Sequence, residues 1–108
     1  MKFKEIFTQA INTKSKLQVT FFSKEDNTFL TRLCAPFDIG PSNRSRDQVD
    51  RYHFWDYDSD TGSHTLSLID EQVTDIKILD EKFEPSKIIT WNFKPNSWHL
   101  QRDWGNYS

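Results

Sequence analysis

The spacing of apolar residues changes near the start of the chain from the period of a helix to that of a strand. Over the first positions, apolar residues recur every three or four residues and share one face: Phe3, Ile6, Phe7, Ala10 and Ile11. This spacing predicts an amphipathic helix over residues 2–13. From Lys16 onward apolar and polar residues alternate, which predicts a strand over residues 16–23.

The alternation continues and predicts four more strands. A polar turn at residues 25–27 joins the first strand to a second at 29–35 as a hairpin, which Pro36 disrupts or ends. Further strands are predicted at 51–57, 64–68 and 73–79, with one helical turn at 70–72. A helix stays open as the alternative to the last strand, because its apolar residues Val73, Ile76 and Leu79 are spaced by three.

Two segments lie outside this pattern. Residues 38–50 have almost no apolar content and are predicted to form a long loop. Residues 86–108 place aromatic side chains in polar sequence on both sides of Pro95, which indicates an extended arm. Only a short helix is predicted there, over residues 85–90.

The order of these elements predicts a mainly β fold. One helix precedes five short antiparallel strands, and no βαβ alternation favours a parallel sheet. A small closed or nearly closed five-stranded barrel is expected, because closure removes exposed strand edges. The predicted organisation is one helix-plus-barrel domain over residues 1–85 and a C-terminal arm over 86–108, which packs on the barrel or on a partner.

Composition fits one folded domain of 108 residues and excludes several protein classes. Aromatic residues supply 15% of the chain, which excludes a disordered protein and indicates a core built on aromatic rings. No apolar run approaches the roughly 18–20 residues of a membrane span, and no signal peptide precedes the first helix. With Cys34 as the single cysteine, we expect a cytoplasmic protein without disulfides or membrane contact.

Charge is unevenly distributed around a net value of −2. Residues 1–55 hold nine basic and six acidic side chains, whereas residues 56–84 hold two and nine. This balance argues against a general nucleic-acid coat but permits a local basic patch. Four arginines fall within twenty residues: Arg32, Arg44, Arg46 and Arg51. Because guanidinium groups bind phosphates, they predict an anion site; the alternative is pairing with Asp38, Asp47, Asp50 and Asp56.

A second candidate feature is the aromatic strand at 51–57. His53, Trp55 and Tyr57 share one of its faces. If that face were exposed beside the arginines, it would stack nucleobases. The alternative is that the arm covers this face with Trp91, Trp98 or Trp104.

No catalytic or metal-binding motif emerges from the spacing. The three histidines and Cys34 lack the spacing of metal ligands, and the acidic stretch from Asp56 to Gly62 lacks the glutamate that completes a calcium loop. A nucleophile elbow, a P-loop and a dinucleotide fingerprint are absent. We therefore expect a protein without enzymatic activity, cofactor or metal.

Taken in order, several short stretches of residues 6–85 resemble the WYL domain, an Sm/SH3-like small barrel of bacterial regulators. They are Ala10–Ile11, Val19–Phe21, Thr31–Leu33, Ala35–Phe37, Tyr52–Trp55, Ser67–Ile69, Gln72–Val73 and Phe83–Pro85. Two features of the family are missing: Tyr52–Trp55 replaces the Trp-Tyr-Leu tripeptide, and no arginine lies within residues 66–70. The resemblance implies a short bacterial or phage protein whose barrel binds nucleotides or single-stranded nucleic acid.

The expected function is thus that of a non-enzymatic regulatory or ligand-binding module. Its nucleotide or single-stranded nucleic acid would be held by the four arginines, with His53 or Trp55 stacking on a base. The alternative is a protein-interaction or assembly subunit. In that case Trp91, Trp98 and Trp104 of the arm would dock on another protomer or on a partner protein.

Overall fold

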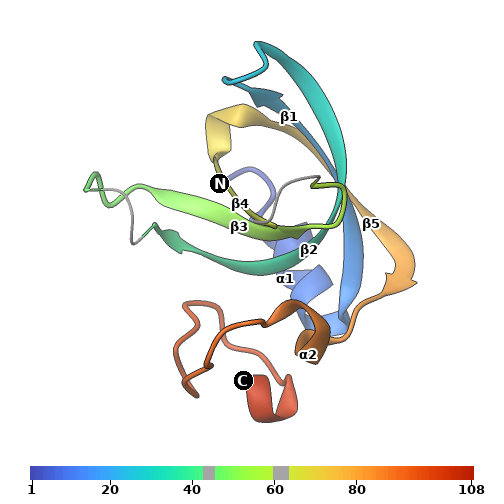
Figure 1. The fold of residues 1–108 in the computed structure, drawn as a ribbon, viewed down its shortest axis with the longest axis vertical. Coiled ribbons are helices and arrows are strands. Elements are labelled where there is room, and N and C mark those ends of the chain that lie inside the picture. Colours follow the sequence, from blue (N-terminus) through green and yellow to red (C-terminus); the bar gives the residue numbers. More distant parts are fainter. Residues whose placement is uncertain (43–45, 60–63) are drawn as a thin grey trace.

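The computed structural model describes residues 1–42, 46–59 and 64–108. Its elements are α1 (Lys4–Thr13), β1 (Ser15–Ser23), β2 (Thr28–Pro41), β3 (Asp50–Asp56), β4 (Thr65–Ile69), η1 (Asp70–Gln72), β5 (Val73–Lys82), α2 (Pro85–Ile88) and η2 (Gly105–Tyr107). The five strands form one antiparallel sheet in the order β4-β3-β2-β1-β5 (Figure 1). The prediction of a helix followed by five antiparallel strands is confirmed, and residues 73–79 are strand, not helix. None of the described helices is long and apolar enough to cross a bilayer.

The predicted closed barrel is wrong, because β4 and β5 remain the two edges of an open sheet. Among the described residues, the Gln72 side chain bridges the gap between β4 and the β1–β2 hairpin. Gln72 accepts a hydrogen bond from the Ile69 N–H (3.3 Å) and donates one to the Phe22 carbonyl (3.2 Å). With only five residues, β4 ends at η1, and the chain then crosses to pair with β1.

Strand β2 is longer than the sequence predicted and pairs with two neighbouring strands. Its first half pairs with β1, and its second half, beyond Cys34, pairs with β3. Pro36 does not end the strand, because a register shift between Pro36 and Asp38 leaves Phe37 as the extra residue of a bulge. Proline is tolerated at such bulges, since the ladder is already interrupted there. The loop predicted at residues 38–50 therefore shrinks to the connection between Pro41 and Asp50.

Helix α1 covers one face of the sheet with the residues that its spacing predicted. Phe7, Ala10 and Ile11 are fully buried, and Phe3 and Ile6 are partly buried beside them. The Phe7 ring lies 5.5 Å from the Tyr52 ring and 5.4 Å from the Phe54 ring, measured between centroids. These aromatic contacts form the centre of the core, as the composition indicated.

The C-terminal segment, residues 90–108, covers part of the other face (Figure 1). Trp104 is 4% exposed; its ring packs edge-on against Phe83, and its indole N–H donates to the Ile11 carbonyl at 2.9 Å. Because both faces of β2 are covered in this region, residues 34–40 are buried without interruption. The C-terminal segment and α1 thus pack against opposite faces of β2.

Candidate functional site

Among the described residues, the structure does not bring Arg32 and Arg51 together. Arg32 lies in the first half of β2 and donates to the Asp58 carbonyl (2.8 Å), whereas Arg51 on β3 lies opposite Gly40 near the other end of β2. Eight residues of strand separate these two levels, about 26 Å along the chain. A single phosphate cannot contact both side chains.

Arg51 and Arg46, the other described arginines at the β3 end of the sheet, form no cluster with each other. The Arg51 guanidinium binds Asp47 in a bidentate pair at 3.0 and 3.1 Å, which is the pairing left open as the alternative. Arg46 is exposed in the connection between β2 and β3. Arg44 lies outside the described residues.

His53 and Trp55, the two predicted stacking residues, are already engaged within the chain. His53 Nε2 donates to the Gly40 carbonyl (2.8 Å), so in the neutral ring Nδ1 accepts from the Ser67 hydroxyl (2.7 Å). The Trp55 ring stacks on His64 with centroids 4.6 Å apart, and Phe37 meets it edge-on. Trp55 is therefore not an open platform for a base.

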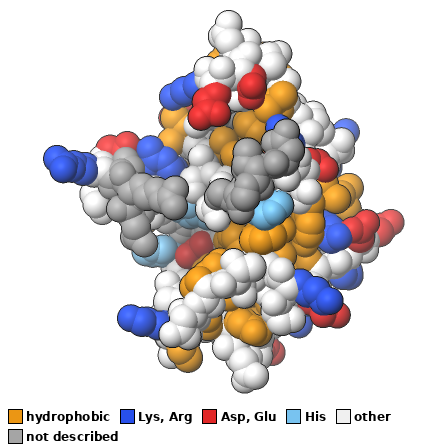
Figure 2. Space-filling model, in the orientation of Figure 1, with side chains coloured by type: hydrophobic (Ala, Val, Ile, Leu, Met, Phe, Trp, Pro, Cys, Tyr) orange, Lys and Arg blue, Asp and Glu red, His pale blue; other side chains and the backbone are white. Residues whose placement is uncertain are grey.

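A groove of about 790 Å³ opens next to His53, between the sheet and the C-terminal segment. We call it the aromatic groove. It is lined by Phe37, Asp38, Pro41, Ser42, His53, Thr65, Ser67, Trp91, Ser97, Trp98 and His99. Figure 2 shows hydrophobic side chains gathered where the C-terminal segment meets the sheet, with histidine beside them.

Trp91 is the exposed aromatic side chain of this groove. It remains 46% exposed, yet two rings hold its position: Phe37 at 5.3 Å and Trp98 at 6.2 Å, both edge-on. The sequence indicated Trp91 as an anchor for docking, or as one of the arm tryptophans that cover the face of His53 and Trp55. Phe37 and His99 were missed, because the first belongs to the bulge and the second lies far from β2 in the chain.

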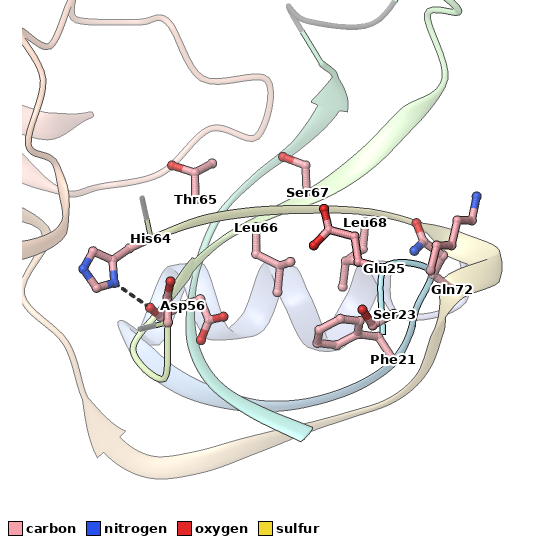
Figure 3. A pocket seen from close by; sticks show the side chains of 12 residues that line it. Phe21, Ser23, Glu25, Asp56, His64, Thr65, Leu66, Ser67, Leu68 and Gln72 are labelled. Carbon is pink, nitrogen blue, oxygen red and sulfur yellow. Dashed lines mark hydrogen bonds between the residues drawn. The ribbon is translucent and has the colours of Figure 1, made fainter. Parts of the chain in front are cut away.

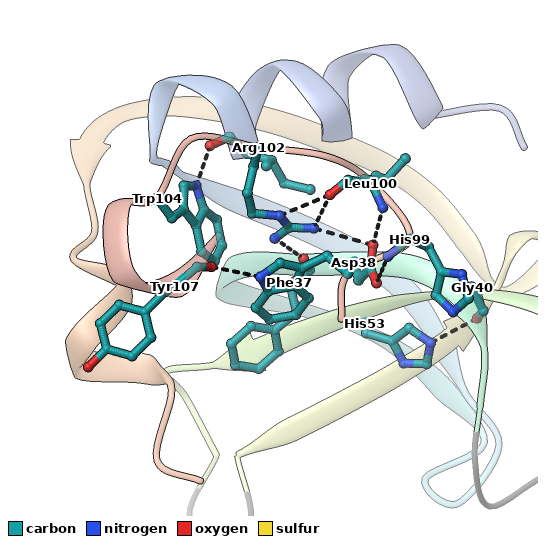
Figure 4. A network of polar contacts seen from close by, with 11 residues as sticks. Phe37, Asp38, Gly40, His53, His99, Leu100, Arg102, Trp104 and Tyr107 are labelled. Carbon is teal, nitrogen blue, oxygen red and sulfur yellow. Dashed lines mark hydrogen bonds and ion pairs between the residues drawn. The ribbon is translucent and has the colours of Figure 1, made fainter. Parts of the chain in front are cut away.

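A buried carboxylate on the bulge fastens the C-terminal segment to the sheet (Figure 4). Asp38 accepts hydrogen bonds from the backbone N–H groups of His99 (2.8 Å) and Leu100 (2.9 Å). It also forms an ion pair with Arg102 at 3.3 Å. We call Asp38, Trp98, Arg102 and Trp104 the Arg102 latch.

The Arg102 side chain is fully buried within this latch, at 0% exposure. Its guanidinium lies over Trp98 at 4.1 Å and over Trp104 at 4.4 Å, and it donates to the carbonyls of Phe37 and Leu100. Burial lowers the pKa of Arg102 to about 10, although the charge of Asp38 acts in the opposite direction. The latch holds Trp98, one wall of the groove, in place.

The C-terminal segment packs closely on β2 because position 40 is a glycine. A Cβ atom at Gly40 would lie 2.9 Å from Cγ and Nε2 of His99. The His99 ring therefore packs directly on the β2 backbone, beside the carbonyl that His53 binds. His99 therefore reaches the groove because position 40 has no side chain.

A second pocket of about 430 Å³ lies where the sheet fails to close, between β4 and the β1–β2 hairpin. Figure 3 shows Leu66 of β4 directed toward Phe21, with Glu25 of the hairpin nearby. Asp56 and Gln72 complete its lining together with Ser23, Lys24, Ser59, His64, Thr65, Ser67 and Leu68. We call it the hairpin pocket.

No reactive or metal-ligating group stands out in the described parts of the chain. They contain no set of three or more His, Cys, Asp or Glu side chains able to hold a metal ion. Burial raises the pKa of the Cys34 thiol well above its ordinary value, and the charges of Asp56 and Asp58 raise it further. Such a thiol is a poor nucleophile at neutral pH.

Comparison with known proteins adds no relationship to this geometry. The chain matches no protein-family model, no curated protein and no solved structure.

Proposed function

We propose that this protein is a non-enzymatic binding module that holds a nucleobase in the aromatic groove. The observation that carries the proposal is Trp91, a half-exposed indole held in place by Phe37 and Trp98. Stacking on an aromatic ring stabilises a bound base by roughly 1–3 kcal/mol. A side chain that is already positioned loses little conformational entropy on binding.

The polar lining supports the same ligand class. The His99 ring can donate to or accept from the edge of a base, and the Ser67 hydroxyl, which already donates to His53, can still accept. Relative to the sequence-based hypothesis, His53 keeps a place in the site, whereas Trp91 takes the stacking role assigned to Trp55. Arg32 and Arg51 do not belong to a common anion site in this proposal.

The ligand class agrees with the one implied by the resemblance to WYL domains, a relationship that is itself a proposal. A free nucleotide and a single-stranded nucleic acid share the base that the groove would hold. They differ in their phosphates, so the dependence of affinity on salt separates them.

The test is a titration with two kinds of probe. Nucleoside monophosphates are followed by calorimetry, and fluorescein-labelled single-stranded decamers are followed by anisotropy at two salt concentrations. We expect Trp91→Ala to weaken binding roughly 5- to 150-fold, the loss of one stacked base. Phe29→Ala is the matched control, because Phe29 is 60% exposed on the β1–β2 hairpin, outside the groove lining.

Two results would contradict the proposal. One is wild-type protein that binds neither probe. The other is equal affinity for Trp91→Ala and Phe29→Ala, since the exposed indole of the groove would then contribute nothing.

A further inference from the structure

The two edges of the sheet differ in chemistry. Strand β5 carries five charged side chains along its length: Asp75, Lys77, Asp80, Glu81 and Lys82. Strand β4 carries none; its sequence is Thr-Leu-Ser-Leu-Ile. Natural proteins protect exposed edges with charged side chains, because an unprotected edge pairs with other strands. The edge at β4 lacks that protection.

Every second residue of β4 directs its backbone N–H and C=O away from β3, toward the open edge of the sheet. The Asp56 N–H donates to the His64 carbonyl at 2.7 Å, which fixes the alternation of the β3–β4 ladder. By that alternation, Thr65 and Ser67 direct their N–H and C=O groups to the open side. No residue in the described parts of the chain hydrogen-bonds to these four groups.

The two pockets lie on opposite sides of this edge. Thr65 and Ser67 line both the aromatic groove and the hairpin pocket. Figure 3 shows Leu66 and Leu68 directed toward the hairpin pocket, with Thr65 and Ser67 directed the other way. A strand added to β4 would project successive side chains alternately to these two sides.

Acidic side chains surround the edge and indicate the occupant. Glu25 and Asp56 line the hairpin pocket, with Lys24 as its one basic lining residue among those described. Asp70 and Glu71 follow β4 directly in η1; Asp70 is paired with Lys2 of the same chain, whereas Glu71 is exposed. This charge suits lysine or arginine side chains. A second copy of the chain would bring equal acidic charges together, which disfavours pairing of β4 with itself.

We propose that the open edge of β4 binds an extended basic peptide segment of a partner protein by strand addition. Main-chain hydrogen bonds form with Thr65 and Ser67. Apolar side chains of the peptide enter the aromatic groove, and its lysine or arginine side chains face the exposed Glu25 at the hairpin pocket. Strand addition of this kind is a recurrent mode of peptide recognition. The proposal does not depend on nucleobase binding, which uses Trp91.

The probe is an acetylated and amidated octapeptide in which lysine and phenylalanine alternate. Two matched peptides accompany it, one with glutamate in place of lysine and one with every second backbone amide N-methylated. Binding to the full chain is measured by calorimetry. We expect the lysine peptide to bind, and the other two to bind roughly tenfold more weakly or worse, because they lose charge pairing and main-chain hydrogen bonds respectively.

Thr65→Pro is the matched change in the protein. It removes the outward N–H at the first residue of β4, a position where proline is compatible with a strand. Thr65→Val keeps the N–H and is the control. We expect Thr65→Pro to weaken peptide binding roughly tenfold, and Thr65→Val to bind like wild type. Ser67→Pro provides a second test of the same edge.

Circular dichroism establishes that each variant is folded. Peptide binding that is lost in Thr65→Pro and kept in Thr65→Val supports strand addition, because both variants change the groove-lining side chain and only Thr65→Pro loses the N–H. Equal binding of the N-methylated peptide, or no binding of the lysine peptide to wild type, would overturn it. So would a peptide-independent dimer that Thr65→Pro dissociates, because the occupant would then be a second copy.

Discussion

Arg102 carries its charge into a site without access to solvent, where planar stacking and hydrogen bonds replace water. Its guanidinium donates four hydrogen bonds, to Leu100 twice, to Phe37 and to Asp38. Removal of one member of a buried ion pair leaves the other member unpaired, which usually destabilises strongly. If Arg102 is removed, Asp38 keeps hydrogen bonds from two backbone N–H groups, but its buried negative charge loses the positive charge that balances it.

We expect Arg102→Ala to lower the free energy of unfolding by about 3–5 kcal/mol, measured by urea denaturation. Arg102→Lys keeps the charge but loses the flat face between Trp98 and Trp104, so it recovers only part of that loss. Arg46→Ala, at an exposed position, is the control and stays within about 0.5 kcal/mol of wild type. A stability loss no larger than this control would mean that the latch does not hold the segment.

Gly40 makes a second prediction at the residue scale. A methyl group there overlaps the His99 ring, so we expect Gly40→Ala to cost about 1–3 kcal/mol in thermal unfolding. His99→Ala removes the obstructing ring. In a double-mutant cycle the cost of Gly40→Ala should therefore fall when His99→Ala is present. An unchanged cost would place the strain elsewhere in β2.

Among the elements, the C-terminal segment shows how unequal its three tryptophans are. Trp104 is buried, with its indole N–H bonded to the Ile11 carbonyl of α1, whereas Trp98 is partly buried against Arg102 and Trp91 is half exposed. The segment thus has a buried anchor at one end and an open surface at the other. The hypothesis of an arm that docks on another molecule would have to use Trp91, because the other two rings pack within their own chain.

A matched pair of substitutions measures this difference. Trp104→Ala loses the contact with Phe83 and the hydrogen bond to Ile11, so we expect about 3–5 kcal/mol of lost stability. For Trp91→Ala we expect less than about 1 kcal/mol. Each kcal/mol corresponds to a fall in melting temperature of roughly 4–8 °C for a domain of this size. Similar losses for both variants would contradict the anchoring role of Trp104.

At the scale of the molecule, Asp70 joins parts of the chain that are distant in sequence. Its carboxylate accepts hydrogen bonds from the Lys2 backbone N–H (3.0 Å) and the Tyr52 hydroxyl (2.6 Å). Burial acts to raise the pKa of Asp70, but these bonds and the charge of Lys2 outweigh it and hold the pKa below its ordinary value. The start of the chain, β3 and η1 therefore meet at one charged group.

A depressed pKa in the folded state stabilises the fold above the ordinary pKa of the group, and this contribution is lost as the pH falls through the folded value. We therefore expect Asp70→Asn to melt below wild type at about pH 7, with a difference that shrinks toward about pH 3. Glu84→Gln, at an exposed position, serves as control. If the difference in melting temperature between Asp70→Asn and wild type did not change with pH, the loss would come from altered packing or hydrogen bonding and not from the charge of Asp70.

The elements themselves were predictable because their signals are local. Helix α1, its buried face and the alternation of β1 follow from spacing over a few residues, and burial of one face depends on that spacing alone. The same reasoning ended β2 at Pro36, since a bulge depends on the partner strand and leaves no periodic signal. Arg32 and Arg51 are far apart in the structure for a related reason, because each position of an extended strand adds about 3.3 Å.

What the sequence by itself determined is the set of elements, the helix face in the core and the mainly β class. Only the tertiary structure decided that the sheet stays open at β4, that Asp38 meets Arg102 and that Trp91 remains exposed while Trp104 is buried. Asp38 and Arg102 lie 64 positions apart, and their contact requires both the bulge in β2 and the return of the C-terminal segment. Periodicity reports which side of an element is buried, whereas the partner across that interface is selected by packing of the whole chain.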